Sequence, residues 1–265
     1  ATKNPNVSLE FDLGDDDEPR QWSYRIEFTA MSTKDRTPVL VSEVIHHDGT
    51  LLLNRPDADD KKDRMRLSQT ALQQVNANMS FRAIAEFFSS VRYLHVIPQI
   101  VRDPGRSGGK DDPFGGDLIE RINSTTKRTR DARLKRMEEA LQIAVPQMRD
   151  LELEIDERGV PHLRAKYEHW RPQGAWQREN RFSDGTLRLL GLIWSLQETG
   201  GPLLLEEPEM SLNPAVVSRI APMISKAARR SKRQSLITTH SVDLLSDGVD
   251  LSEVYLLYPS DQGTT

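Results

Sequence analysis

The chain has 265 residues, of which 37% are hydrophobic and 29% are charged, a composition typical of a polar but foldable soluble protein. It contains no cysteine, so disulfides and thiolate metal sites are excluded. No apolar run is as long as a membrane span and no signal peptide opens the sequence, so we expect a cytoplasmic protein with no membrane partner. The net charge of -4 gives no overall argument for nucleic-acid binding, which would need a local basic patch.

Three β-hairpins are predicted from alternating apolar and polar residues around turn sequences. They pair residues 7–13 with 22–31, residues 39–45 with 50–53, and residues 151–155 with 162–167. Asp48-Gly49 supplies the tight turn of the second hairpin. The neighbouring His46 and His47 should point to opposite faces of a strand, so we expect them to share no metal. The mixed-charge run 55–66 is predicted to be an exposed loop.

The middle of the chain is predicted to be mainly helical. An amphipathic helix over 81–91 precedes a strand over 93–97, and 117–144 is expected to be largely helical. This long segment carries six cations, which usually form a solvated helix face but are also the best candidate for a basic patch. They are Lys127, Arg128, Arg130, Arg133, Lys135 and Arg136. A loop containing Trp170 and Trp176 is expected before the next motif.

A Gly-rich run over 104–111 imitates a phosphate-binding loop of the type G-x-x-x-x-G-K-[ST]. Pro104 takes the place of the first glycine, and Asp111 stands where a Ser or Thr would hold Mg²⁺. Because the Asp111 carboxylate would also repel phosphate, we interpret the run as a flexible loop.

An acid-ended strand organises the C-terminal part of the chain. Residues 201–209, Gly-Pro-Leu-Leu-Leu-Glu-Glu-Pro-Glu, predict a short buried strand that ends in Glu206 and Glu207. In open α/β sheets the chemistry lies just beyond the carboxyl ends of such strands. Two adjacent acids are costly to bury unless a cation or a proton-transfer role holds them. The alternative is a strand that runs out into a solvated acidic loop.

Three further segments accompany this strand in a defined order. Residues 182–186, Phe-Ser-Asp-Gly-Thr, precede an apolar helix that Ser183 or Asp184 would cap, and such a helix start is also an anion site. Ser211-Leu212-Asn213-Pro214 leads into a helix over 215–228. Residues 234–241 form another short strand ending in Thr-Thr-His-Ser, and a parallel sheet would bring His240 beside the carboxylates. A helix start at 242–245 and a last strand over 253–258 follow.

The order of these four segments resembles the carboxyl-terminal half of an ABC-type ATPase. The most similar groups are RecF, SMC, Rad50 and the ATPases of OLD-type and other anti-phage systems. The resemblance is strong over residues 181–258 and only architectural over residues 7–167. It implies that Ser183, Asp184, Gly185 and Thr186 form the signature motif, which contacts the nucleotide bound by the opposite protomer.

The resemblance implies further roles at the strand ends and in the turn that follows. Glu206 matches the Walker B acid that holds Mg²⁺ through water, and Glu207 matches the general base that orients the attacking water. Ser211, Leu212 and Asn213 match the D-loop, and His240 matches the switch histidine that senses the γ-phosphate. Phosphoryl transfer is mostly positioning and charge neutralisation, and these residue types suit that chemistry.

Three features depart from the family pattern. Glu206 stands where many relatives have Asp, and Ser-Asp-Gly-Thr replaces the more usual Ser-Gly-Gly. No P-loop is present, and since the family carries it near the N-terminus, we expect that the sequence begins after it. The alternative, a protein that has lost nucleotide binding, would leave nothing to offset two adjacent buried acids. Gln99 is a weak candidate for the Q-loop residue.

We therefore expect an α/β fold of the P-loop NTPase class. It would be an ABC-ATPase-like head with a mixed sheet flanked by helices and with antiparallel hairpins in the N-terminal part. A single domain would cover 1–265, with parts 1–80, 81–170 and 171–265. The expected function is ATP binding and hydrolysis with Mg²⁺ in a head-to-tail homodimer with composite sites. This would be coupled to DNA or to an effector such as a nuclease, in DNA repair or anti-phage defence. The alternative is a nucleotide-gated scaffold with little turnover; a DNA-binding module based on residues 127–136 is a weaker hypothesis.

Overall fold

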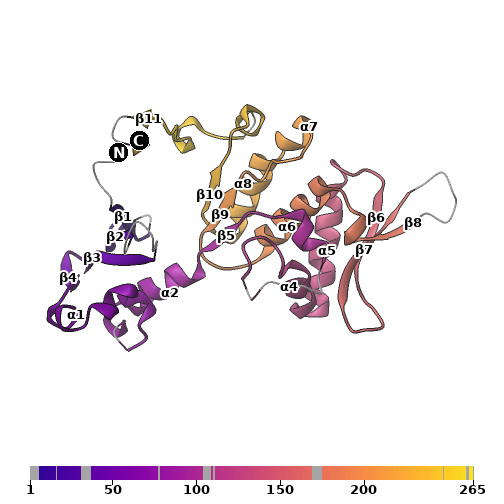
Figure 1. Ribbon diagram of the computed structural model, residues 1–265. Coiled ribbons are helices and arrows are strands. Elements are labelled where there is room, and N and C mark those ends of the chain that lie inside the picture. Colours follow the sequence, from indigo (N-terminus) through magenta and orange to yellow (C-terminus); the bar gives the residue numbers. More distant parts are fainter. Residues whose placement is uncertain are drawn as a thin grey trace. The chain divides into compact units, whose positions relative to one another are not determined.

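The computed structural model describes residues 6–15, 17–30, 37–76, 78–103, 109, 111–168, 175–246, 248–260 and 263–264. By its internal contacts the chain forms two compact units (Figure 1). The first unit contains Ala1–Ser89 and Tyr255–Thr265, and the second contains Ser90–Val254. The first boundary thus lies beyond residue 80, where the sequence places the end of the hairpin part. In the described part of the chain, no helix combines the length and the apolar composition needed to cross a membrane.

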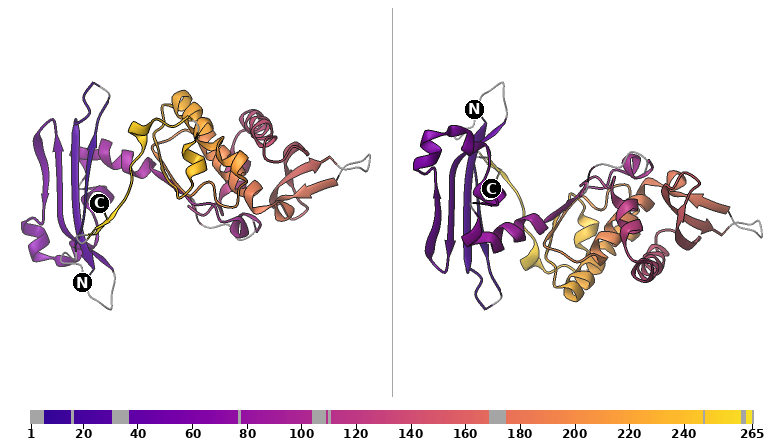
Figure 2. Two further views of the ribbon diagram at one scale, coloured as in Figure 1. Left: turned by 90° about the horizontal axis from the view of Figure 1, so that it is seen from above. Right: turned by 90° about the horizontal axis from the view of Figure 1, so that it is seen from below.

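The first unit is built on an antiparallel sheet in the order β1-β2-β3-β4 (Figure 2). Its strands are β1 (Val7–Leu13), β2 (Trp22–Ala30), β3 (Pro38–His47) and β4 (Thr50–Arg55), and its helices are α1 (Ala58–Lys62) and α2 (Arg82–Ser90). The first two predicted hairpins are confirmed. The amphipathic helix is also confirmed, because α2 packs Ile84 and Phe88 against Phe11 and Tyr24. Two-residue strands, β11 (Pro259–Ser260) and β12 (Gly263–Thr264), pair with each other.

The run 55–66 is not the exposed loop that its charges predict. The side chains of Arg55 and Asp60 are 3% and 0% exposed. Arg55 Nη1 donates to Glu43 Oε2 at 3.0 Å, while its Nε and Nη2 donate to the two oxygens of Asp60, each at 2.9 Å. The prediction was wrong because a charge becomes buried when its partners are buried with it, and Glu43 lies on another element, β3.

The second unit contains a parallel sheet in the order β10-β9-β5. Its strands are β5 (Arg92–Leu94), β9 (Leu203–Glu206) and β10 (Ser235–Thr238). The acid-ended strand β9 is central, as predicted, and its Leu203 and Leu205 are buried. Four helices accompany the sheet: α3 (Pro98–Val101), α6 (Asp184–Gln197), α7 (Pro214–Val217) and α8 (Ile220–Ser231). The single helix expected over 215–228 is therefore two helices.

Helix α6 lies at the centre of the core of the second unit. Most of its residues are buried, including Leu187, Leu190 and Trp194 at 0% exposure. A Cβ at Gly191 would lie 2.6 Å from Val96 Cγ2, so a glycine here allows the helix to pack closely on the segment that follows β5. Because α6 begins at Asp184, its packing fixes the position of the predicted signature segment.

The remaining elements of the second unit pack beside α6 (Figure 1). They are α4 (Leu118–Ser124), α5 (Lys127–Leu141), and the antiparallel sheet of β6 (Met148–Ile155), β7 (Pro161–Tyr167) and β8 (Ala175–Arg178). The third predicted hairpin is confirmed. The helix expected over 117–144 is divided by extended backbone at Thr125 and Thr126. Trp176 lies in β8 rather than in a loop, and residues 169–174 lie outside the described part.

Two expected C-terminal elements are absent from the described residues. Residues 242–245 form a 3-10 turn instead of an α-helix, and 254–258 form no strand. Tyr255, Leu256, Leu257 and Tyr258 are 60–87% exposed. The backbone N–H and C=O groups of a strand need hydrogen-bond partners on a neighbouring strand. The apolar composition of residues 253–258 predicts a strand but does not supply that neighbour.

Candidate catalytic edge of the parallel sheet

Strands β9 and β10 end at the same edge of the parallel sheet. Glu206 pairs in register with Thr238, and the Glu207 N–H donates to the Thr238 carbonyl at 2.9 Å. The residues that follow the two strands therefore lie near each other, and His240 Nε2 is 3.3 Å from Glu207 Oε1. The prediction that a parallel sheet brings His240 beside the carboxylates is confirmed.

The two acids are not buried, which corrects one argument made from the sequence. Glu206 is exposed, and the side chain of Glu207 is 30% exposed. The cost of burying two carboxylates thus gives no reason to infer a bound cation. The backbone of Glu207 has a φ of +40°, a left-handed conformation that costs a non-glycine residue roughly 1–2 kcal/mol. Unfavourable backbone geometry of this kind is concentrated at functional sites.

Strand β5 and the residue that follows it contribute two side chains that the sequence did not reveal, Tyr93 and His95. The Tyr93 hydroxyl donates to the Glu206 carboxylate, and His95 Nδ1 lies 3.4 Å from the Glu206 carbonyl oxygen. The signal that could have found them is the same as for His240, namely polar residues at the end of a strand that neighbours β9. Gln99, the weak Q-loop candidate, lies in α3 and is exposed.

Ser183 caps the predicted signature helix. Its Oγ accepts a hydrogen bond from the Thr186 N–H at 3.2 Å and lies 2.8 Å from Thr186 Oγ1. Ser183 is exposed, Asp184 is half-buried, and Gly185 and Thr186 are buried. Arg102 holds the segment, because its Nη2 donates to the Phe182 carbonyl at 2.9 Å and to Asp184 Oδ1 at 2.5 Å. Solvent therefore meets mainly the Ser183 and Asp184 side of this helix start.

The predicted signature segment and the predicted D-loop are in contact within this chain. A Cβ at Gly185 would lie 2.9 Å from the Ser211 carbonyl oxygen, so a glycine is required for this approach. Ser211 has a φ of +64°, which places a sharp turn there. Asn213 caps α7 by accepting the Ala215 N–H at 2.9 Å. The structure thus brings Ser211 next to the signature segment, while the Asn213 side chain serves the next helix.

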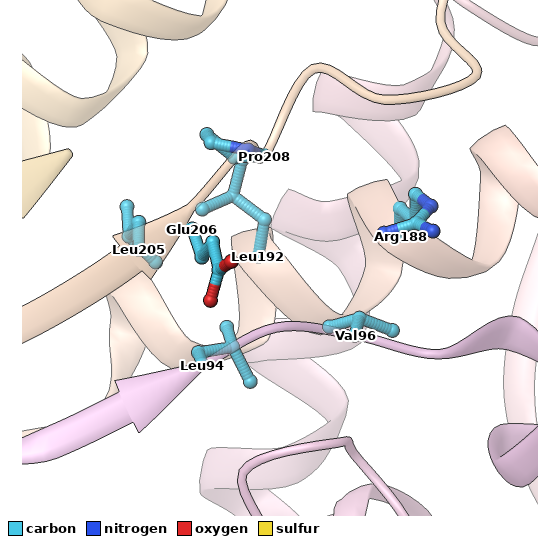
Figure 3. Close-up of a pocket in the computed structure, with 7 residues that line it drawn as sticks. All are labelled: Leu94, Val96, Arg188, Leu192, Leu205, Glu206 and Pro208. Carbon is cyan, nitrogen blue, oxygen red and sulfur yellow. The ribbon is translucent and has the colours of Figure 1, made fainter. Parts of the chain in front are cut away.

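Arg188, one helical turn after Asp184, lines a small pocket together with Glu206 (Figure 3). Leucine, valine and proline side chains form the rest of the pocket wall: Leu94, Val96, Leu192, Leu205 and Pro208. Burial lowers the pKa of Arg188, while the charges of Asp184 and Glu207 oppose this effect. Its Nε is buried and has no hydrogen-bond partner among the described residues. The sequence analysis overlooked Arg188, although a cation within the run Leu187-Arg188-Leu189-Leu190 is a recognisable signal.

The edge can hold a magnesium ion only with help from other ligands. Among the described residues, no group of three or more His, Asp or Glu side chains could bind a metal. Mg²⁺ normally takes one or two carboxylates, several waters and substrate phosphates, and Glu206 can supply one carboxylate of that donor set. Residues 104–108 and 110 of the Gly-rich run lie outside the described part.

One family model matches most of the chain. The family model described as "AAA domain, putative AbiEii toxin, Type IV TA system" matches residues 1–247. Among curated proteins, none matches the chain.

Several solved structures match at low identity. An SMC head bound to the C-terminal winged-helix domain of ScpA is 15% identical, with a TM-score of 0.46, over 91% of this chain and 67% of the other. The SMC head domain of Thermotoga maritima is 12% identical, with a TM-score of 0.40, over 98% and 72%. A structure from a study of ATP-driven dimerization and DNA-stimulated activation of SMC ATPases is 16% identical, with a TM-score of 0.40, over 52% and 83%.

Proposed function

Because this chain belongs to the AAA-domain family whose model matches residues 1–247, we propose that it binds and hydrolyses ATP as one protomer of a dimer. The expected α/β fold of the P-loop NTPase class is confirmed together with this membership. The expected mixed sheet is not found, because each sheet among the described residues is either wholly parallel or wholly antiparallel. The observation that carries the proposal is the meeting of Glu206, Glu207 and His240 at one edge of a parallel sheet. Ligand sites of open α/β sheets lie at that edge.

The proposed chemistry assigns a separate task to each side chain. Glu207 accepts a hydrogen bond from the attacking water and orients it toward the γ-phosphate. His240, 3.3 Å from Glu207, donates to the γ-phosphate as negative charge develops there. Such positioning and charge stabilisation provide most of the catalysis of phosphoryl transfer.

The proposal includes Mg²⁺ as the companion of ATP. Glu206 would hold it through water, and the ion would neutralise charge on the phosphates. The Tyr93 hydroxyl, which donates to the same carboxylate, would keep Glu206 oriented. A phosphate-binding P-loop is also required, and the sequence contains no G-x-x-x-x-G-K-[ST] segment. The proposal therefore concerns the intact protein in which this chain occurs, placed in the cytoplasm, where ATP is available.

Coupling of the nucleotide state to DNA, or to an effector such as a nuclease, completes the proposal. This part, with its setting in DNA repair or anti-phage defence, rests on the sequence resemblance alone. Turnover decides between an ATPase that drives such a partner and a nucleotide-gated scaffold that holds one.

The catalytic part of the proposal is tested by Glu207→Gln in the intact protein. We expect ATP binding to persist and turnover to fall about 10²–10⁴-fold, as is usual when a general base is lost. Glu157→Gln, in the exposed turn between β6 and β7, is the matched control and should hydrolyse ATP normally. Near-normal hydrolysis by Glu207→Gln would remove this residue from the mechanism, and slow wild-type turnover with tight ATP binding would favour the scaffold.

The dimer is tested by mixing two inactive variants, Ser183→Arg and Glu207→Gln. If the exposed Ser183 completes the site of a partner, a mixed dimer has one site with both lesions and one site with neither. Partial activity should then return on mixing. Absence of recovery, with mixed dimers demonstrated by a tag on each variant, would mean that Ser183 acts within its own protomer as the cap of α6.

A further inference from the structure

Glu209 is the acid of the loop after β9 to which the proposed chemistry gives no task. Its Oε1 accepts a hydrogen bond from the Thr239 hydroxyl. Its Oε2 is buried and receives no hydrogen bond from the described residues. The carboxylate is therefore anchored through one oxygen to the turn that carries His240.

The Thr239 hydroxyl connects two segments. It donates to Glu209 and also accepts the Ser241 N–H at 2.9 Å, so it closes the turn around His240. The backbone ladder between β9 and β10 ends with the hydrogen bond from Glu207 to Thr238. Beyond this point a side chain must hold the turn, and a hydroxyl bound to a carboxylate is a strong link.

The exposure of His240 makes this link important. Its side chain is 92% exposed, so packing does little to fix the ring near Glu207. The position of the turn then determines where the ring lies. A displacement of about 1 Å in a catalytic group is enough to reduce a rate strongly.

We propose that Glu209 is a positioning residue that, through Thr239, holds His240 in contact with Glu207. This inference rests on the proposed ATPase function and adds a residue to its machinery. Glu209 acts as a hydrogen-bond acceptor in this role, and its negative charge is not used on the substrate. An amide, which keeps a carbonyl acceptor, can therefore replace the carboxylate.

The test compares turnover by Glu209→Ala, Glu209→Gln, Thr239→Val and Thr239→Ser in the intact protein. We expect kcat to fall about 10- to 100-fold in Glu209→Ala and in Thr239→Val, because a misplacement of about 1 Å in a catalytic group can cost about 10²-fold. The KM for ATP should stay within about twofold, because the ring acts as charge develops rather than in binding. Glu209→Gln and Thr239→Ser should both stay close to wild type. The double variant Glu209→Ala/Thr239→Val should lose no more than either single variant.

Two results would overturn the proposal. Equal losses in Glu209→Gln and Glu209→Ala would show that the charge itself acts, for example on a metal ion. Multiplied losses in the double variant would show that Glu209 and Thr239 act independently. Glu157→Ala serves as the control for removal of an exposed acid.

A second readout keeps the inference separate from the proposed function. The imidazole NMR signal of His240, assigned by its absence in His240→Ala, should shift in Glu209→Ala and in Thr239→Val but not in Glu157→Ala. If wild-type protein hydrolyses no ATP, the proposed function fails while this measurement still decides whether Glu209 positions His240. An unchanged signal in Glu209→Ala would refute the positioning role.

Discussion

Replacing the buried Arg55 with Met should lower the unfolding free energy of the first unit more than replacing an exposed arginine would. Arg55 makes five hydrogen bonds, three of them to Glu43 and Asp60 and two to carbonyl oxygens. Its removal leaves two carboxylates without this cation, both at 0% exposure. Breaking a buried ion pair from one side costs about 3–5 kcal/mol. Both carboxylates keep other donors, Ala71 N–H for Glu43 and Arg66 for Asp60, so we expect the lower end, about 3 kcal/mol.

The measurement is urea unfolding at pH 7, with Arg25→Met as the matched control in the same unit. Arg25 pairs with Glu10, but both side chains are more than half exposed, so its loss should cost less than about 1 kcal/mol. Equal losses in the two variants would refute the reasoning from burial.

The pH dependence of this loss tests its electrostatic cause. The pKa of Asp60 lies well below its usual value, and the main cause is the hydrogen bonding from Arg55. A carboxylate with a lowered pKa stabilises the fold above its unfolded pKa of about 3.9, and the contribution disappears as the pH falls through the folded pKa. Without Arg55, burial acts to raise this pKa, so the folded variant takes up a proton on mild acidification. The difference in unfolding free energy between wild type and variant should therefore narrow from pH 7 to pH 4. A constant difference would indicate lost packing instead.

Three further predictions concern the second unit. His240→Ala should slow hydrolysis about 10²-fold or more without lowering the unfolding temperature, because the side chain is 92% exposed; a loss mainly of stability would indicate a structural role. Tyr93→Phe removes the donor that orients the Glu206 carboxylate and should raise the Mg²⁺ concentration for half-maximal turnover about 2- to 10-fold. An unchanged or lower requirement would contradict the orienting role of the hydroxyl. Neutralising Arg130, Arg133 and Arg136 should lower the unfolding temperature and leave DNA affinity, measured by fluorescence anisotropy, weak and unchanged. The reason is that these side chains contact Asn123, Trp194 and Gln197 inside the unit. If the wild type instead bound DNA tightly with a steep salt dependence, and this variant did not, α5 would be a DNA-binding surface.

Local patterns in the sequence predict the framework of the site because each acts over a few residues. The alternation in residues 7–13 and 22–30 specifies a hairpin, and the apolar runs ending at Glu206 and Thr238 specify two parallel strands. Ser183 was expected as one of two possible caps, and the structure assigns the role to it. These features follow from period, length and capping, which need no knowledge of distant partners.

What the sequence did not predict depends on contacts between distant segments. Burial of Arg55 requires Glu43 from another strand, and the approach of Tyr93 to Glu206 joins residues 113 positions apart. The exposure of Glu206 could not be read from the apolar strand before it, because a strand can be central while its last side chain faces solvent. The position of a charged residue in the sequence does not indicate which residue it will pair with in the fold.

The exposure of the candidate site in one protomer gives an independent reason to expect that a second surface closes over it. Glu206 and Ser183 are exposed, and His240 is 92% exposed beside a partly exposed Glu207. Two unit charges about 4 Å apart interact by about 1 kcal/mol in bulk water but about 4 kcal/mol at the lower effective dielectric constant of a protein surface. The same side chains would thus orient water and stabilise phosphate charge more strongly once water is excluded. The composite site of the proposed dimer would supply that exclusion without any change in the strands that place the residues. The mixing experiment with Ser183→Arg and Glu207→Gln therefore tests the source of the catalytic rate as well as the oligomeric state.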